Sequence, residues 1–425
     1  MRECEKIRKK FAPNLYELFG KVTDPRRPGS ILYGMTEMLG TVYFKNLIGM
    51  TSMRSMTEFF EDERIVRNLY HYLGVNEREQ LPHYQTINDL LCRVDPEEIQ
   101  EIIWKICYQL IRRKSFDQAK DRNKWRIIVD ATVTQSGSRK LNEHCLERCY
   151  NRGKKNETHC YYNAVLEAKL YLGNQLIASI GSEFIENGGA DRERQKQMSE
   201  EAIKQDCEIK AFKRLAKRLK QRFPRLPVCI LGDSLYASEP VMDICKENGW
   251  DYILRYKEGS APSIGEEFEN IPEKGEAQYH DEKNGRKGTI TFVNDISYRK
   301  HEIHMVRCIE MDKRNAKQTF QYLTTMRIDR ENAKKTVESG RSRWKIENQG
   351  FKRQKQEAQD ITHACSWNAQ ALKNHYLLAQ LADLIRKLYE VWYLEKQGIQ
   401  KTQKKVSSDL LSSLYQPLPE SEDTS

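Results

Sequence analysis

The first part of the chain carries apolar residues at a helical period. The longest such stretch runs from Ile31 to Phe60 and follows a basic turn at Asp24 to Gly29. A second Pro-marked turn precedes a short helix with Ile87 and Leu90 on its apolar side. We therefore expect residues 1–120 to form a helical N-terminal region.

From Lys124 onward, runs rich in β-branched residues predict strands instead. Two of these runs are mainly apolar and end in an acid, which indicates buried strands of an inner sheet. The predicted elements are the strands Trp125 to Asp130 and Pro227 to Asp233, a hairpin of Tyr161 to Leu172 with Gln175 to Phe184 around Gly173-Asn174, a basic amphipathic helix Asp206 to Phe223, and a strand Trp250 to Tyr256.

Strands and helices in this order predict an α/β fold, a mixed sheet flanked by helices. Alternating runs then predict a β-rich insertion, and a helix around Glu347 and a long helix from Ser366 to Leu394 follow. The polar end of the chain is expected to be disordered. The predicted units are 1–120, helical; 121–258, first part of the core; 259–329, β-rich insertion; 330–398, second part of the core and C-terminal helix; and 399–425, polar tail.

The balance of charge narrows the choice of partner. The 425 residues include 71 Lys and Arg against 61 Asp and Glu, a formal net charge of +10. Such a surplus favours a polyanion, and nucleic acid before a membrane, because no basic amphipathic helix stands at either end. No apolar run approaches the ~20 residues of a membrane span, no signal peptide opens the sequence, and the 11 cysteines are scattered. We expect a cytoplasmic protein with reduced thiols.

Three acids stand where a functional site is expected. Asp130 and Asp233 both end apolar strands, and open α/β sheets bind ligands at the carboxyl ends of their strands. Glu347 lies four residues after Arg343, so the two share one helix face. Each acid alone has an ordinary explanation, a turn residue or an intrahelical ion pair. Their combination favours a carboxylate site.

The short helix near residue 88 offers a possible DNA contact. As the second helix of a helix-turn-helix it would present Gln85, Asn88 and Arg93 to the grooves. The alternative is an ordinary packing helix of an N-terminal bundle, because the motif is degenerate without a defined partner helix.

Cysteine and histidine crowd the loop expected between the first two core strands. Thiolates and imidazoles suit a structural Zn²⁺, but the spacing fits no standard finger, and reduced thiols without metal are the alternative. The residues concerned are His144, Cys145, Cys149, His159 and Cys160.

Several short motifs of the chain resemble those of one enzyme family. They are VDAT at 129–132, LGDSLYAS at 231–238 and RWKIEN at 343–348, with KQDCE at 204–208 and DPR at 24–26. These motifs are similar to DDE transposases with an RNase H-like core, of the insertion-sequence group that includes the IS4 family. The resemblance implies that Asp130, Asp233 and Glu347 are the catalytic acids.

The chain departs from the family's signature at two positions. Gly340 stands where the signature has Tyr, and Gln354 stands where it has Lys. Lys355 or Lys352 can take the place of that Lys in holding a DNA phosphate. Arg343 can orient Glu347 or grip a phosphate through two hydrogen bonds.

The resemblance implies a DNA transposase of an insertion sequence. Hydrolysis at the transposon ends would use two Mg²⁺ (or Mn²⁺) ions held by the three acids, and the freed 3′-hydroxyl would then carry out strand transfer. The implied partners are the terminal inverted repeats, target DNA and a second copy of the chain, in a bacterial cytosol or nucleoid.

Three alternatives stay open at this point. The first is a domesticated, catalytically silent DNA-binding protein, and the second is an RNase H-like nuclease that acts on another nucleic acid. Paired carboxylates also serve glycosidases, although the basic surplus disfavours such an enzyme.

Overall fold

The structure is a computed structural model, and it describes residues 1–187, 207–259, 261–281, 285–311 and 316–418. Within this part of the chain, no helix combines the length and the apolar character that crossing a bilayer requires. The expected acidic end of the tail, residues 420–423, and the first residues of the KQDCE motif lie outside the described residues.

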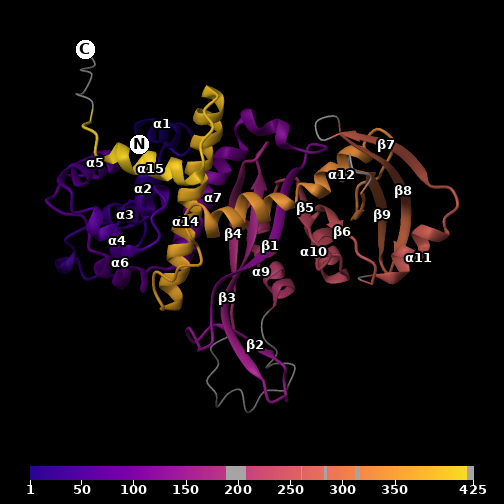
Figure 1. Ribbon diagram of the computed structural model, residues 1–425, viewed down its shortest axis with the longest axis horizontal. Coiled ribbons are helices and arrows are strands. Elements are labelled where there is room, and N and C mark those ends of the chain that lie inside the picture. The colour runs from indigo at the N-terminus through magenta and orange to yellow at the C-terminus, as the bar shows by residue number, and fades with distance from the viewer. Residues whose placement is uncertain (188–206, 260, 282–284, 312–315, 419–425) are drawn as a thin grey trace.

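The N-terminal region is helical, as the apolar period predicts. Its helices gather at one end of the molecule, coloured indigo to purple in Figure 1, and the long predicted stretch becomes two helices separated at Gly49. They are α1 Arg2–Phe11, α2 Leu15–Gly20, α3 Met35–Leu47, α4 Met53–Phe59, α5 Glu63–Leu73, α6 Tyr84–Leu91 and α7 Pro96–Ile111.

A ten-stranded sheet crosses the rest of the molecule in the order β2-β3-β1-β5-β6-β10-β9-β8-β7, with β4 paired to β3. Strands β1, β5 and β6 are parallel, and the other pairs are antiparallel. This arrangement confirms the mixed α/β class. The strands are β1 Trp125–Gly137, β2 Leu146–Tyr150, β3 Thr158–Tyr171, β4 Ile177–Ile185, β5 Val228–Gly232, β6 Asp251–Arg255, β7 Gly275–Asp281, β8 Arg286–Tyr298, β9 His301–Met311 and β10 Lys317–Thr324.

Helices cover the sheet and return the chain to it. The predicted basic helix follows β4, and the chain reaches β6, which is parallel to β5, through a helix, as a connection between parallel neighbours needs a crossover. These later helices are α9 Glu208–Arg222, α10 Glu239–Asn248, α11 Pro262–Asn270, α12 Ala333–Arg341, a π-helical segment Ile346–Lys352, α13 Arg353–Gln356, α14 Ala369–Tyr389 and α15 Gln403–Leu414.

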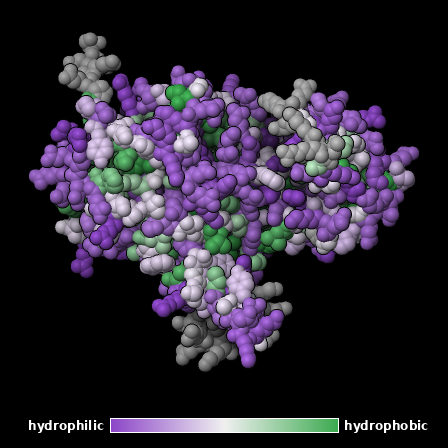
Figure 2. All heavy atoms as spheres, in the orientation of Figure 1, coloured by the Kyte–Doolittle hydropathy of each residue, from purple (hydrophilic) through white to green (hydrophobic). Residues whose placement is uncertain are grey.

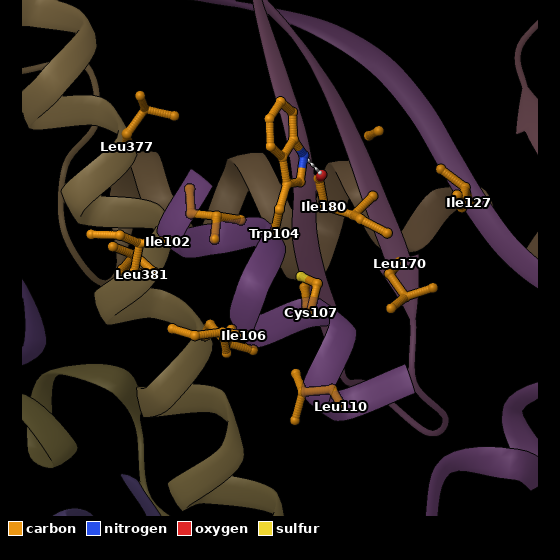
Figure 3. Close-up of a cluster of buried hydrophobic side chains, with 14 of the residues drawn as sticks. Ile102, Trp104, Ile106, Cys107, Leu110, Ile127, Leu170, Ile180, Leu377 and Leu381 are labelled. Carbon is orange, nitrogen blue, oxygen red and sulfur yellow. Dashed lines mark hydrogen bonds between the residues drawn. The ribbon is translucent and has the colours of Figure 1, made fainter. Parts of the chain in front are cut away.

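The N-terminal helices and the sheet share one hydrophobic core. Figure 3 shows α7 between α14 and the sheet, with Ile102 and Ile106 toward Leu377 and Leu381. On its other side, Trp104 donates its indole N–H to the carbonyl of Ile180 at 2.8 Å. A helix apolar on both sides, such as α7, therefore joins the N-terminal region rigidly to the core.

The predicted insertion is β-rich and lengthens the sheet. Strand β10 pairs with β6 through Tyr322 and Arg255, so β7 to β10 continue the core sheet at its far edge. Figure 1 shows them, in orange, at the end of the molecule opposite the N-terminal helices.

The polar tail was predicted to be disordered, and for residues 403–414 this prediction is wrong. These residues form α15, which buries Val406, Leu410 and Leu414. The three apolar residues recur at four-residue spacing among polar ones, so a single narrow stripe packs while the average composition remains that of a disordered segment.

The segment from 340 to 355 is not the continuous α-helix that its composition predicts. Helix α12 ends at Arg341, a turn follows, and the chain resumes as a π-helical segment. A Cβ atom on Gly340 would lie 2.6 Å from the ring of Tyr322, so this position, where the signature has Tyr, has no room for any side chain. A π-helix has a wider turn than an α-helix, so faces deduced from a 3.6 period do not hold across it.

Candidate active site

Asp130 lies within β1, and the prediction that it ends the strand is wrong. Strand β1 continues to Gly137 along β3, but its pairing with β5 ends at Ile128 opposite Leu231. Asp130 therefore stands where β1 loses its parallel neighbour. Because β5 stops and turns away, the edge of β1 is open beside Asp130, and a local hydrophobic pattern could not reveal this.

Asp233 follows directly after β5, as predicted. Its Oδ1 accepts the backbone N–H of Leu235 at 2.8 Å, the usual turn contact of an Asp after a strand. The side chain is partly exposed, so this contact leaves the second carboxylate oxygen available.

Glu347 comes from the π-helical segment and reaches Asp130 through Arg343. The buried guanidinium of Arg343 places Nη1 2.8 Å from Glu347 Oε1 and 3.5 Å from Asp130 Oδ2. The predicted ion pair between Arg343 and Glu347 thus exists, and it also includes an acid far away in the sequence. A π-helical turn is rare in proteins, but the turns that do occur are often found at functional sites, because they reorient side chains within a helix.

Asp130 is perturbed by its burial and by the charges around it. The pKa of Asp130 is raised to about 7, chiefly by burial; Arg343 opposes this shift, and the charges of Glu208, Asp233 and Glu347 add to it. The structure therefore brings the three sequence-predicted acids into one electrostatically coupled group. The carboxylate oxygens of these three acids do not all lie within 4.8 Å of one another. Among the described residues, the one group of possible metal ligands that meets this distance lies elsewhere, on the hairpin of β2 and β3.

Glu208 is a fourth carboxyl group at this site, and sequence reasoning missed it. It opens α9, accepts the hydroxyl of Tyr236 at 2.5 Å, and has a raised pKa through burial and the nearby charge of Asp233. Glu208 ends the KQDCE motif and Tyr236 lies in LGDSLYAS, so both stood in recognised motifs. An acid in the first turn of a helix is usually only a favourable helix charge, so its position gave no separate signal.

This group of acids fits divalent cations. Three carboxyl groups, those of Glu208, Asp233 and Glu347, act together with burial to disfavour the charged form of Asp130. Carboxylate oxygens are the ligands that hard cations such as Mg²⁺ prefer, and a cation would compensate the repulsion that raises the pKa of Asp130.

The two lysines predicted to contact phosphate, Lys352 and Lys355, differ in their exposure to solvent. Lys352 is exposed, while Lys355 is half-buried with a pKa lowered by burial. Gln354, which replaces the signature Lys, is buried and donates to Gln380 at 3.0 Å, so it serves packing and cannot contact DNA.

Asn88, a predicted DNA contact, is half-buried, and its amide is engaged within the protein. Its Oδ1 lies 2.7 Å from His375 Nε2, and its amide donates to the carbonyl of Cys365 at 3.3 Å. Helix α6 packs against α14 with this polar residue at the contact, so the packing alternative holds for Asn88. Gln85 on this helix and Arg93, two residues beyond its end, are exposed and remain predicted DNA contacts.

The predicted Cys/His loop is a β-hairpin, formed by β2 and β3. Of the five suggested zinc ligands it brings Cys149 and His159 together, with Glu157 as a third group. Cys145 is buried, and its thiol donates a hydrogen bond to the carbonyl of Asn142. Cys160 on β3 is paired with Arg148 on β2. His144 contacts the carbonyl of Asn187.

Comparison with known families matches two parts of this chain. Residues 204–381 match the family described as "Transposase DDE domain", and residues 16–105 match the one described as "DDE_Tnp_1-associated". Together the two ranges hold more than half of the chain. The first includes Glu208, Asp233 and Glu347, whereas Asp130 lies between the two ranges.

Among solved structures, the chain is similar to a piggyBac transposase in a synaptic complex with hairpin DNA. The two are 13% identical, the alignment covers 97% of this chain and 79% of that one, and the TM-score is 0.45. This likeness is too weak to support a functional conclusion. No curated protein matches the chain.

Proposed function

Because this chain belongs to the DDE transposases, enzymes of metal-dependent DNA cleavage and strand transfer, we propose that Asp130, Asp233 and Glu347 are its catalytic carboxylates. One observation carries this proposal: the three acids come from β1, the end of β5 and the π-helical segment, and the charges of Asp233 and Glu347 still help to raise the pKa of Asp130. A solvated surface acid has no reason to meet two others from distant elements.

Asp130 is the acid that the others surround, so we assign it the shared metal-ligand position, with Asp233 and Glu347 on either side. When bound, two divalent ions would lower the pKa of the attacking water and stabilise the leaving oxygen. We propose Mg²⁺, or Mn²⁺ in its place, because the three proposed ligands offer only oxygen.

Arg343 acts as a positioning residue for Glu347. A buried guanidinium in contact with two carboxylates fixes their orientation and balances part of their charge. Since its Nη1 is engaged with both acids, we assign phosphate contacts to Lys352 and Lys355 instead.

The proposed substrate is double-stranded DNA at the terminal inverted repeats of an insertion sequence, followed by target DNA. We propose that two copies of the chain act on paired ends, which size measurements of the complex with end DNA would test. Because its proposed substrate is DNA, we propose a bacterial cytosol or nucleoid as the location of the enzyme.

The test is single-turnover cleavage of DNA that carries the element ends, in Mg²⁺, by Asp130→Asn, Asp233→Asn and Glu347→Gln proteins. Each change keeps the side chain's shape and removes its charge, so we expect cleavage to fall at least about 10³-fold while end binding persists. Glu357 is an exposed acid ten residues beyond Glu347, so Glu357→Gln is the matched control and should cut normally.

The outcomes also separate the alternatives. Near-normal cutting by any one of the three variants would remove that residue from the site. A wild-type protein that binds the ends and never cuts would be a silent DNA-binding protein, and cutting without preference for the ends would indicate a general nuclease.

A further inference from the structure

The β2–β3 hairpin projects from the body of the molecule (Figure 1). Strand β1 follows β3 only as far as Tyr161, opposite Gly137, so beyond that point the hairpin has two strands. None of residues 147–160 is buried. A two-stranded hairpin without an apolar core is marginally stable in water, so its tip needs another source of order.

Pairing in this hairpin gathers metal-binding side chains on one face. Cys149 and His159 are directly opposite in the antiparallel ladder, so their side chains point to the same side. Side chains two residues apart along a strand also share a face, which adds Glu147 beside Cys149. Glu157, just before β3, joins them through its contact with His159. The sequence spacing fits no zinc finger because the ligands come from both strands.

The side chains on this face are in contact. His159 Nε2 lies 3.1 Å from Glu157 Oε1, and Nδ1 lies 2.5 Å from Glu147 Oε1. Ligand atoms of Cys149, Glu157 and His159 all lie within 4.8 Å of one another. Ligands about 2.0–2.3 Å from a tetrahedral Zn²⁺ are roughly 3.3–3.8 Å apart, so a contraction of about 1 Å would complete the site.

We propose that Cys149, Glu157 and His159 bind a structural Zn²⁺ ion that links the two strands at the tip of this hairpin. A thiolate, an imidazole and a carboxylate suit zinc, and the thiolate disfavours Mg²⁺ and Ca²⁺. With Nε2 on the ion, the other ring nitrogen donates to Glu147, the arrangement that commonly orients a zinc-bound histidine. A water molecule would take the fourth position.

An ion pair of His159 with the two glutamates is the simpler explanation of the same contacts. In that explanation the Cys149 thiol makes only weak hydrogen bonds, to Glu157 and to the carbonyl of Tyr150 at 3.9 Å, and ion pairs exposed to solvent contribute little to stability. The zinc site uses all four side chains and supplies the cross-link that the hairpin lacks. It also holds in place Arg148, Arg152, Lys154 and Lys155, the basic residues of the exposed tip.

The test is addition of Co²⁺, a spectroscopic substitute for Zn²⁺, to the full-length protein after chelator treatment, in excess Mg²⁺. We expect one equivalent to give the absorption of a tetrahedral cobalt–thiolate centre, which Zn²⁺ then removes. The oxygen-only site at Asp130 cannot give a thiolate band. Cys149→Ser should abolish the band and weaken Zn²⁺ binding at least about 10²-fold, and Glu147→Gln should weaken it about 10- to 100-fold.

Cys160→Ser is the matched control, because Cys160 pairs with Arg148 and points to the opposite face. It should bind Co²⁺ like the wild type. Trypsin should cut the basic tip more slowly once Zn²⁺ is bound in the wild type and in Cys160→Ser, and at an unchanged rate in Cys149→Ser. Absence of a thiolate band in the wild type, or a wild-type band in Cys149→Ser, would overturn the proposal.

Discussion

At the residue scale, Asp130 shows how the site is built from opposing effects. Burial would neutralise its carboxyl group, and Arg343 favours its charged form. Three further acids add repulsion that a cation would relieve. Without a cation, the repulsion among these acids lowers the stability of the folded protein. Relief of this repulsion contributes to the affinity of the site for a cation.

Glu208 is expected to strengthen this affinity although it was not among the predicted ligands. Glu208→Gln keeps the bond from Tyr236 and removes one charge near Asp130 and Asp233. We expect the Mg²⁺ concentration for half-maximal cleavage to rise about tenfold, the range of changes around a metal site. Thermal stability should be unchanged or higher, since repulsion falls. An unchanged Mg²⁺ requirement would show that Glu208 only anchors α9.

Substitutions of Arg343 and of Lys352 are expected to affect different steps, cleavage and DNA binding. Arg343→Gln removes the guanidinium that holds Glu347 beside Asp130, so cleavage should fall about 10²-fold with nearly unchanged DNA affinity. Lys352→Ala should weaken DNA binding and lower its salt slope by about one, with little effect on cutting at saturating DNA. Binding isotherms at several salt concentrations and single-turnover cleavage measure both. The reverse pattern would exchange the two roles.

At the element scale, the segment after Glu347 is held by buried ion pairs. Arg353 contacts Glu390 at 2.7 Å and Asp383 at 3.7 Å, and Asp383 also contacts Lys387 at 2.6 Å. Helix α14 carries Asp383 and Lys387, and Glu390 follows its last residue directly. Paired charges in a protein interior contribute little net stability, but they fix one arrangement because every alternative leaves a charge unpaired. The catalytic segment is thereby fixed against α14 and the sheet.

The contact between α14 and α6 is expected to make stability depend on pH. Burial lowers the pKa of His375 from 6.5 to about 3, and the positive charges of Lys45 and His363, which face it, act in the same direction. Between these values the unfolded chain binds more protons. Stability from this residue is therefore complete above about pH 6.5 and decreases as the pH falls toward 3.

We expect His375 to cost about 2 kcal/mol of unfolding free energy between pH 7 and pH 5. Denaturant unfolding of the wild type and His375→Gln at both pH values isolates this contribution from other titrating groups. The variant should lose about 2 kcal/mol less than the wild type over this interval. Equal losses would mean that His375 titrates normally in the folded protein.

At the scale of the whole molecule, the N-terminal helices, the core and the extended sheet form one body with a largely hydrophilic surface (Figure 2). Apolar patches on the face shown are small and separated. With a net charge of +10, attraction for a polyanion must come from basic side chains spread over this surface.

Affinity for end DNA should therefore fall steeply with salt. A protein that neutralises several phosphates releases their counterions, so binding should weaken at least about tenfold between ~50 and ~200 mM monovalent salt. Titrations of labelled end DNA at fixed Mg²⁺ measure the slope. Flat binding over this range would count against phosphate contacts as the main source of affinity.

The sequence alone determined the local features of this protein. Apolar periodicity specified the helices and the buried strands, because each reflects which face of a segment is removed from water. Gly173 and Asn174, at φ 102° and 45°, form the expected turn for the same local reason. The three motifs with their acids were also readable, since they are short and contiguous.

Tertiary structure decided what depends on neighbours distant in sequence. Asp130 lies at an open edge of β1 because the pairing with β5 ends before it. Glu208 meets Tyr236 at the site because α9 begins there. The side chain of Asn88 is hydrogen-bonded within the protein because α14 packs against its helix. Gly340 is required by the ring of Tyr322. Cys149 and His159 become partners only through the register of β2 on β3. Such contacts follow from pairing and packing of whole elements, which no local pattern of residues encodes.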